Sequence, residues 1–199
     1  MYDNVYCFNA SEEYNLQTIK NVQPLRTPAE IDDMKWALEK YCSQRDRFMF
    51  VFGINTGLRV SDIVKLKVKD VRGKTHILIR EKKTKKTKRF SLFTHLRQEI
   101  EQYIRGMEDE DYLFPSRKGN SHISTTQAYR VLVKAGEMLG RDDIGTHTMR
   151  KTFGYAYYRK TKDIAFLQEI FNHSSSNITK RYIGIIQEEI DKSLEDFGL

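Results

Sequence analysis

The sequence predicts an α+β domain that is mostly helical and contains one small antiparallel β-sheet. Most apolar residues recur at the three- and four-residue spacing of amphipathic helices, whereas strand-like patterns are confined to residues 68–93. The 199 residues are 39% hydrophobic and 12% aromatic, enough for one full-sized core and too few for two comfortable domains.

The first 23 residues are polar and aperiodic, which favours an N-terminal arm with at most a short strand at residues 5–8. The domain is expected to begin at Pro24. Thr27 followed by Pro28 is a typical helix start, because threonine caps the free backbone amides and proline suits the first helical position.

Two further helices are expected before the sheet. Residues 47–56 are apolar nearly all round, so they should form a buried helix that ends at the C-cap Gly57. A short helix should follow over residues 60–66. Strands are expected at residues 68–71, 75–80 and 89–93, with residues 82–88 as the tip of a β-hairpin.

The remainder shows helical periodicity. The apolar stripes and cap signals predict six helical segments: 96–107, 128–139, 147–159, 163–171, 175–186 and 187–197. The last of these carries Ile190, Leu194 and Phe197 on one face.

The positive charge is concentrated in the hairpin. The net charge is +7, and residues 80–89 (REKKTKKTKR) account for six of these charges. A local basic patch favours a polyanion such as DNA or RNA, although a solvated lysine-rich loop would look the same. The two cysteines fit no metal or disulfide framework and suit a reducing cytoplasm, and no apolar run is long enough to span a membrane.

Phosphodiester cleavage needs a nucleophile, groups that hold the phosphoryl charge, and a proton donor for the leaving oxygen. Arginine suits the second task because its guanidinium matches phosphate geometry and stays charged. No carboxylate cluster or Cys/His spacing indicates a metal, so a metal-free site is the relevant expectation.

Arg59, in NTGLRVSD, follows the cap at Gly57 and would be rigidly mounted, or else paired with Asp62 or Asp70. His147 and Arg150 share one helical face at the start of a helix, where backbone amides also favour a phosphate. His147 could accept a proton at neutral pH, or serve as a capping or core histidine.

His173 lies at a helix end in FNHSSS and could donate to a phosphate oxygen, or be a solvated loop histidine. Tyr182 lies in NITKRYIGI, where a buried core tyrosine is the plainer interpretation. Chemistry alone does not single it out, because Tyr155, Tyr157 and Tyr158 are also near Arg150 in sequence.

Four stretches in order closely resemble the tyrosine recombinases, the phage-integrase family. They are NTGLRVSDIVKL, ILIREKKTKKTKRFSL, HTMRKTFGYAYY and FNHSSSNITKRYIGI, and the resemblance covers roughly residues 25–186. It implies the catalytic fold of that family over residues 24–186, followed by a C-terminal docking helix at residues 187–199, whose apolar face would dock either on a neighbouring protomer or on its own chain.

The resemblance also implies roles. Tyr182 matches the nucleophile that forms a 3′-phosphotyrosyl bond, Arg59 and Arg150 the phosphate-holding arginines, and His147 the general base. His173 matches the second histidine, which hydrogen-bonds the phosphate, and Asp62 the carboxylate that supports the first arginine. The family needs no metal or other cofactor.

The lysine that protonates the leaving oxygen best matches Lys83, with Lys82, Lys85 and Lys86 as close rivals in a repetitive run. These lysines, together with Lys88 and Arg89, are the expected DNA-binding residues. Asn172 stands where the family usually has glycine, and Lys151 where it often has histidine; neither is expected to take part in the chemistry.

The implied function is site-specific DNA recombination in the cytoplasm on double-stranded DNA, by a homotetramer on two DNA sites. Accessory DNA-bending proteins are candidate further partners. The alternatives are a type IB topoisomerase-like enzyme and a catalytically idle DNA-binding regulator. The N-terminal arm is too short for the family's DNA-clamping domain, so a shortened form or a naturally short member is expected.

Overall fold

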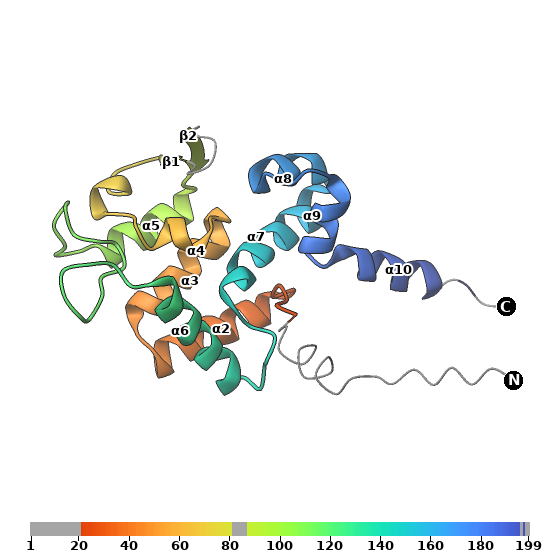
Figure 1. Ribbon diagram of the computed structural model, residues 1–199, viewed down its shortest axis with the longest axis horizontal. Coiled ribbons are helices and arrows are strands. Elements are labelled where there is room, and N and C mark those ends of the chain that lie inside the picture. Colours follow the sequence, from red (N-terminus) through yellow and green to blue (C-terminus); the bar gives the residue numbers. More distant parts are fainter. Residues whose placement is uncertain (1–20, 81–86, 196, 198–199) are drawn as a thin grey trace, which may run out of the picture.

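The computed structural model describes residues 21–80, 87–195 and 197. In this part of the chain, helices surround one two-stranded antiparallel hairpin (Figure 1), which confirms the predicted α+β class. The strand expected at residues 5–8 lies outside the described residues.

The first helices form much as their caps predict. α2 (Pro28–Tyr41) begins with a capping box in which Thr27 accepts from the Glu30 amide at 3.2 Å, and the Glu30 carboxylate accepts from the Thr27 amide at 2.8 Å. The buried α3 (Gln44–Thr56) and the single-turn α4 (Val60–Ile63) follow, the latter shorter than expected.

Gly57, between α3 and α4, is required by both conformation and space. Its φ is +65°, in the left-handed region that favours glycine. A Cβ there would lie 2.4 Å from the Phe153 ring, so the backbone passes directly against α7. This close approach places the Gly57 carbonyl next to α7, the helix that carries His147 and Arg150.

The hairpin pairs β1 (His76–Arg80) with β2 (Thr87–Ser91), with His76 opposite Ser91 and Arg80 opposite Thr87. β2 begins two residues earlier than expected, so Lys88 and Arg89 lie within a strand. Residues 81–86, which hold the other hairpin lysines, lie outside the described residues.

The strand expected at residues 68–71 is wrong. This stretch forms the 3₁₀ turn η1 (Val68–Asp70), closed by the Asp70 carboxylate, which accepts from the Lys67 amide at 2.8 Å. The aspartate side chain offers the backbone a local partner that competes with strand pairing. The valines are buried all the same, so their apolar pattern resembled that of a strand.

The C-terminal half is helical as expected, but the boundaries differ by up to four residues, and two helices, expected to end at residues 107 and 186, end at Tyr103 and Tyr182. The chain turns at Gly184 (φ +75°), so Tyr182 ends a helix instead of lying within one that runs to residue 186. The helices are α5 (Thr94–Tyr103), α6 (Thr125–Met138), α7 (Thr146–Thr161), α8 (Ile164–Phe171), α9 (Ser176–Tyr182) and α10 (Ile185–Glu195).

The interior is divided into two apolar clusters. The larger one fills the space among α2, α3, α5 and α6 and includes Met149 of α7. The smaller one joins the later part of α7 to α8 and α9 through Tyr155, Leu167, Phe171 and Ile183. α7 therefore bridges the two clusters, and it runs between them in Figure 1.

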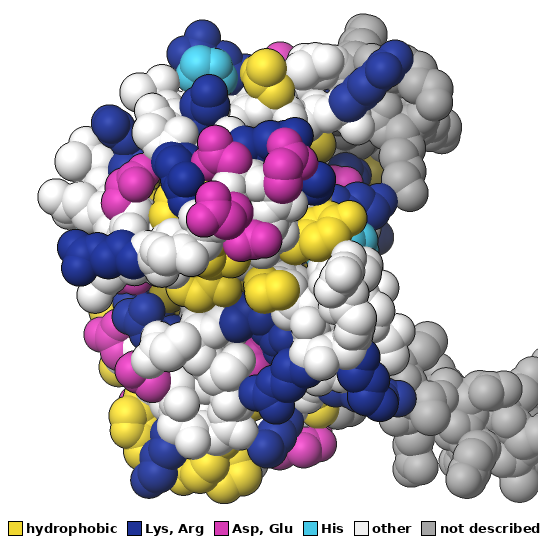
Figure 2. Space-filling model, turned by 90° about the vertical axis from the view of Figure 1, so that its left-hand side faces the viewer, with side chains coloured by type: hydrophobic (Ala, Val, Ile, Leu, Met, Phe, Trp, Pro, Cys, Tyr) yellow, Lys and Arg dark blue, Asp and Glu magenta, His cyan; other side chains and the backbone are white. Residues whose placement is uncertain are grey.

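Acidic and basic side chains are interspersed on the face drawn in Figure 2. Among the described residues, ion pairs join Lys67 and Lys69 to Glu110 and Arg72 to Asp109. This agrees with a near-balanced charge outside the hairpin. Within the described residues, no helix is both long and apolar enough to cross a membrane, and no group of three or more metal-ligating side chains occurs.

Candidate active site

Arg150 is the most buried charged group at the start of α7. Its side chain is 5% exposed, its Nη1 donates to the Gly57 carbonyl at 2.5 Å, and its guanidinium lies 4.3 Å from the centroid of the Phe171 ring. Among the described residues, its Nη2 lies in hydrogen-bond geometry with no partner, although the guanidinium is close enough to the Tyr182 phenol for each group to shift the pKa of the other. An unmatched buried N–H is costly, so the site is suited to an anion that would accept from it.

Arg59 and Arg150 line one small cavity, together with Asp62 and Lys88. Arg59 is exposed, and within the described residues neither Asp62 nor Asp70 forms an ion pair with it. Asp62 does act electrostatically, since its charge favours the protonated form of Arg150. Burial lowers the pKa of Arg150 to about 10, which leaves it charged at neutral pH.

His147 contacts the hydroxyl of Tyr182. The His147 Nδ1 lies 3.0 Å from the Tyr182 oxygen, and the two rings meet edge to face with centroids 6.1 Å apart. Burial lowers the pKa of His147, and the nearby cations Lys151, Arg150 and Arg59 lower it further. The imidazole is therefore neutral at pH 7, so the phenol can donate its hydrogen bond to Nδ1.

Tyr182 is held in its neutral form until a base acts on it. Burial raises the pKa of the Tyr182 phenol, an effect that the charges of Arg150 and Arg59 partly offset. The same two arginines would be the ones to attract a phosphate. His147, at 3.0 Å, can remove the phenol proton, and the two arginines can stabilise the resulting phenolate next to a bound anion.

His173 lies on another side of the Tyr182 ring, with centroids 5.1 Å apart. Its Nδ1 is 3.1 Å from the Thr179 hydroxyl, and Thr179 is fully buried, so the imidazole is held in one orientation. The structure thus brings together His147, Arg150, His173 and Tyr182, and places Arg59 and Asp62 on a cavity that Arg150 also lines.

The hairpin contributes Lys88 to this neighbourhood. Its Nζ donates to the Glu169 carbonyl in α8 at 3.1 Å, and its side chain lines the cavity with Arg59 and Arg150. Arg89, the next residue in β2, is exposed. Lys82, Lys83, Lys85 and Lys86 lie outside the described residues, so their predicted roles stay predictions.

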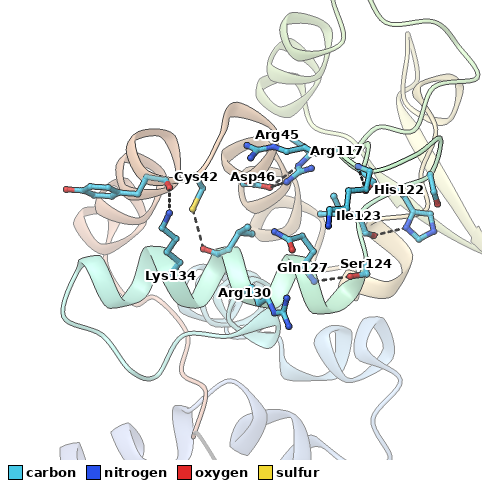
Figure 3. Close-up of a pocket in the computed structure, with 15 residues that line it drawn as sticks. Cys42, Arg45, Asp46, Arg117, His122, Ile123, Ser124, Gln127, Arg130 and Lys134 are labelled. Atoms are coloured by element: carbon cyan, nitrogen blue, oxygen red, sulfur yellow. Dashed lines mark hydrogen bonds and ion pairs between the residues drawn. The ribbon is translucent and has the colours of Figure 1, made fainter.

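A larger cavity of about 600 Å³ lies between the start of α3 and α6 (Figure 3). The cavity is basic, because Arg117, Arg130 and Lys134 line its wall. Its buried charged groups, however, already have ion-pair and hydrogen-bond partners. Arg45 pairs with the buried Asp46 at 2.7 Å and also donates to the Pro115 carbonyl at 2.7 Å. The cavity at Arg150 has the unmatched donor, and it is the better candidate.

Comparison with known proteins identifies the family. The model of the phage integrase family matches residues 27–189. The chain is also 48% identical over 178 residues to the probable integrase/recombinase YoeC of Bacillus subtilis, covering 89% of this chain and 97% of that protein. The chain belongs to the phage integrase family.

Other relatives of this integrase are longer. A tyrosine recombinase of Pseudothermotoga lettingae is 31% identical over 162 residues, which span 77% of this chain and 56% of that protein. Among solved structures, XerA recombinase matches with a TM-score of 0.67 at 23% identity, covering 86% of this chain and 64% of that one. The pre-cleavage complex of XerH with its difH substrate matches with a TM-score of 0.64 at 21% identity, covering 90% and 56%.

These findings confirm the predicted family and fold, and they favour a site-specific tyrosine recombinase over the topoisomerase-like and idle alternatives. Sequence reasoning missed two residues of this integrase's site. Thr179 orients His173, and Lys151 lies over the Tyr182 ring with its Nζ 5.3 Å from the centroid. Thr179 lies within the stretch FNHSSSNITKRYIGI that resembles the family, and Lys151 was noted only as a departure from the family's usual histidine, with no chemical role expected of it.

Proposed function

We propose that this integrase cleaves and rejoins double-stranded DNA through Tyr182. The phenol oxygen attacks the phosphorus of the backbone, a Tyr182–phosphate ester bond forms, and the bond from phosphorus to the 5′ oxygen breaks. The product is a 3′-phosphotyrosyl adduct and a free 5′ hydroxyl. Because the ester conserves the energy of the broken bond, the reverse attack by a 5′ hydroxyl rejoins the strand with no other cofactor.

Two protons move in this reaction. The phenol proton passes to His147, which lies 3.0 Å from the hydroxyl oxygen. The leaving 5′ oxygen takes a proton from a hairpin lysine, for which Lys83 is our choice on sequence grounds. Arg59 and Arg150 hold the non-bridging oxygens as negative charge grows on them, and His173 donates to the same phosphate.

The observation that carries the proposal is the unmatched, buried Nη2 of Arg150 in a cavity shared with Arg59. A structural arginine would be expected to have its donors matched, as Arg45 does in the larger cavity. Here one guanidinium nitrogen anchors the side chain on Gly57 and the other is available to a phosphate oxygen. A catalytically idle DNA-binding protein would have no need of this arrangement next to a tyrosine–histidine pair.

The test is covalent trapping on a nicked suicide duplex, in which the cleaved fragment diffuses away. Wild-type protein should form a protein–DNA adduct and Tyr182→Phe should form none. Tyr155→Phe and Tyr158→Phe are the matched controls and should retain the adduct. An adduct that persists in Tyr182→Phe would transfer the role to another tyrosine.

Assembly on DNA is the second part of the proposal. Ile190, Leu194 and Phe197 are 45%, 59% and 67% exposed, so the apolar face of α10 and the side chain of Phe197 are not covered by the described part of the chain. We expect this face to dock on a neighbouring protomer in a tetramer that holds two DNA sites. Leu194→Asp should leave the melting temperature and DNA binding near wild type and abolish the tetramer seen by light scattering with DNA.

A further inference from the structure

Lys151 stands beside the nucleophile although no role was expected of it. It lies on α7 one turn after His147, so the two side chains project from the same face of the helix. Its Nζ lies 5.3 Å from the centroid of the Tyr182 ring, which is the geometry of a cation–π contact. The ammonium is thus placed against the face of the ring whose hydroxyl meets His147.

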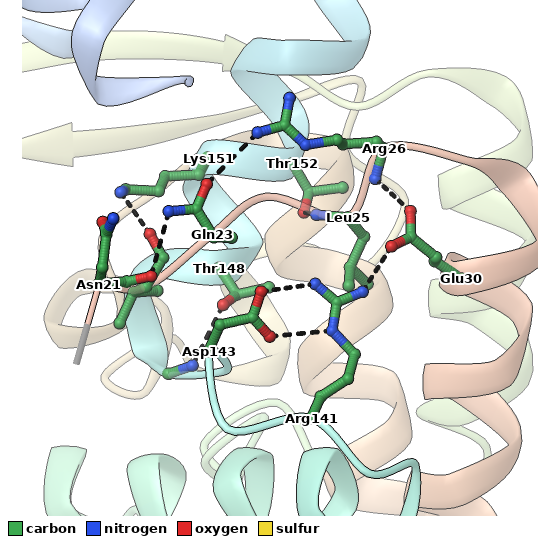
Figure 4. A network of polar contacts seen from close by, with 12 residues as sticks. Asn21, Gln23, Leu25, Arg26, Glu30, Arg141, Asp143, Thr148, Lys151 and Thr152 are labelled. Carbon is green, nitrogen blue, oxygen red and sulfur yellow. Dashed lines mark hydrogen bonds and ion pairs between the residues drawn. The ribbon is translucent and has the colours of Figure 1, made fainter. Parts of the chain in front are cut away.

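The ammonium is also held by a hydrogen bond to the backbone. The Nζ of Lys151 donates to the carbonyl of Val22 at 2.5 Å. Val22 belongs to an extended segment, residues 21–26, that runs along α7 before α2 begins (Figure 4). Because its partner is a main-chain carbonyl and not a mobile side chain, the position of the lysine depends on this segment.

The segment is itself anchored at several points. The Gln23 amide donates to the Asp143 carbonyl at 3.0 Å, and the Leu25 amide donates to the buried Thr152 hydroxyl at 2.9 Å. Leu25 is 2% exposed. Val22 also packs on the start of α7, since a Cβ at Gly145 would lie 3.0 Å from its side chain. The carbonyl that receives Lys151 is therefore held rigidly against the helix that carries His147 and Arg150.

We propose that Lys151 is a positioning residue for the nucleophile: its ammonium, anchored on Val22, holds the Tyr182 ring so that the hydroxyl faces His147. This inference rests on the proposed role of Tyr182. As the phenol loses its proton, negative charge spreads into the ring and the attraction to the ammonium grows, so the contact favours the attacking form over the resting one.

Lys151 also acts on the base. The groups that face His147 are Arg59 from the turn before α4, Arg150 and Lys151 from α7, and the Tyr182 hydroxyl from α9. After burial, Lys151 is the largest cause that lowers the pKa of His147. A positive charge at this position keeps the imidazole neutral, which is the state that can accept the phenol proton.

Three substitutions separate this role from that of a simple anchor. Lys151→Met keeps the aliphatic stem and removes the charge, and Lys151→Arg keeps the charge. Lys67→Met is the matched control, because Lys67 also lies over a tyrosine ring, 5.7 Å from the centroid of Tyr112, in another part of the molecule.

The first measurement is the pH profile of single-turnover cleavage on the suicide duplex. We expect Lys151→Met to cleave about five- to ten-fold more slowly at pH 7, the loss typical of a partly desolvated cation–π contact. Its acid limb should shift to higher pH, because the imidazole protonates more readily without the neighbouring charge. Lys151→Arg and Lys67→Met should keep the wild-type limb. A wild-type profile in Lys151→Met, even with a lowered melting temperature, would reduce Lys151 to a structural anchor and refute the proposal.

The second measurement needs no DNA and no activity. The His147 imidazole is titrated by NMR in the full chain, and its pKa should rise in Lys151→Met and stay unchanged in Lys67→Met. An unchanged His147 pKa in Lys151→Met overturns the electrostatic part of the proposal. Loss of the adduct from wild-type protein would instead overturn the proposed function, so the two failures are distinguishable.

Discussion

Replacing Arg150 tests the phosphate site most directly, because the side chain has one structural and one proposed chemical task. In Arg150→Ala the buried Gly57 carbonyl loses its donor, which costs about 1–3 kcal/mol of the free energy of unfolding. Removing one preorganised charge stabiliser from a reaction site slows it by roughly 100- to 1,000-fold, or about 2.7–4 kcal/mol of transition-state stabilisation. The fall in cleavage rate should therefore be larger than the lower free energy of unfolding alone would cause.

Arg150→Lys separates charge from geometry. A single ammonium can donate to the Gly57 carbonyl or to a phosphate oxygen. It cannot replace the planar guanidinium, whose separate nitrogens can donate to both acceptors at once. We expect Arg150→Lys to bind DNA almost as well as wild type and still to cleave at least ~100-fold more slowly, because charge alone does not restore the paired donors.

The assay is single-turnover adduct formation on the suicide duplex, with DNA binding and the melting temperature measured on the same preparations. Arg72→Ala is the matched control, because Arg72 also donates to a backbone carbonyl, that of Met107, and its ion-pair partner Asp109 is not a residue of the candidate site. Near-normal cleavage by folded Arg150→Ala would remove Arg150 from the reaction and refute the reasoning from its unmatched N–H.

Three other predictions concern the base, the acid and the packing around the nucleophile. The cleavage rate should rise with pH, with a midpoint below about 6.5, the ordinary pKa of histidine, because the lowered pKa of His147 keeps the imidazole unprotonated to lower pH. A single-turnover series from pH 5 to 8 checks this midpoint. A midpoint above that value would exclude His147 as the base. Lys83→Ala should be rescued by a substrate with a 5′-thiol leaving group, which needs no proton, and rescue confined to Lys82 or Lys86 variants would reassign the acid. Gly154→Ala should destabilise the protein by about 1–3 kcal/mol in urea unfolding, because the new Cβ would lie 2.7 Å from Ile183 and 2.8 Å from Phe171. Ala156→Ser, at an exposed position, is the control. Equal stability of the two variants would contradict the close packing.

Much of the site could be predicted because its chemistry is carried by short motifs. His147 and Arg150 share a helix face by their spacing alone, and the order of the motifs singled out Tyr182 among eleven tyrosines. Sequence could not reveal that Arg150 binds the carbonyl of Gly57, because the two are brought together only by the packing of α3 on α7. The same holds for Lys151, whose partners come from two distant segments.

Errors in the fold have local physical causes. The aspartate at position 70 turns a strand-like pattern into a 3₁₀ turn through one side-chain hydrogen bond. The end of α9 was placed too late because Ile186 continues the apolar spacing of the helix, whereas Gly184 adopts a positive φ that stops it. In both cases a single residue overrides a periodicity that several residues share.

The two apolar clusters are unequal, and this gives the halves of the site different local stabilities. Leu58 and the buried apolar side chains of α3 belong to the extensive cluster, whereas Tyr182 is packed on the small one formed by α8, α9 and the end of α7. Segments with few buried contacts open at lower free energy than the global unfolding of the domain. We therefore expect hydrogen exchange to be faster in residues 164–195 than in α3. Strand cleavage would then depend on how often Tyr182 is docked against His147, an equilibrium that bound DNA would shift.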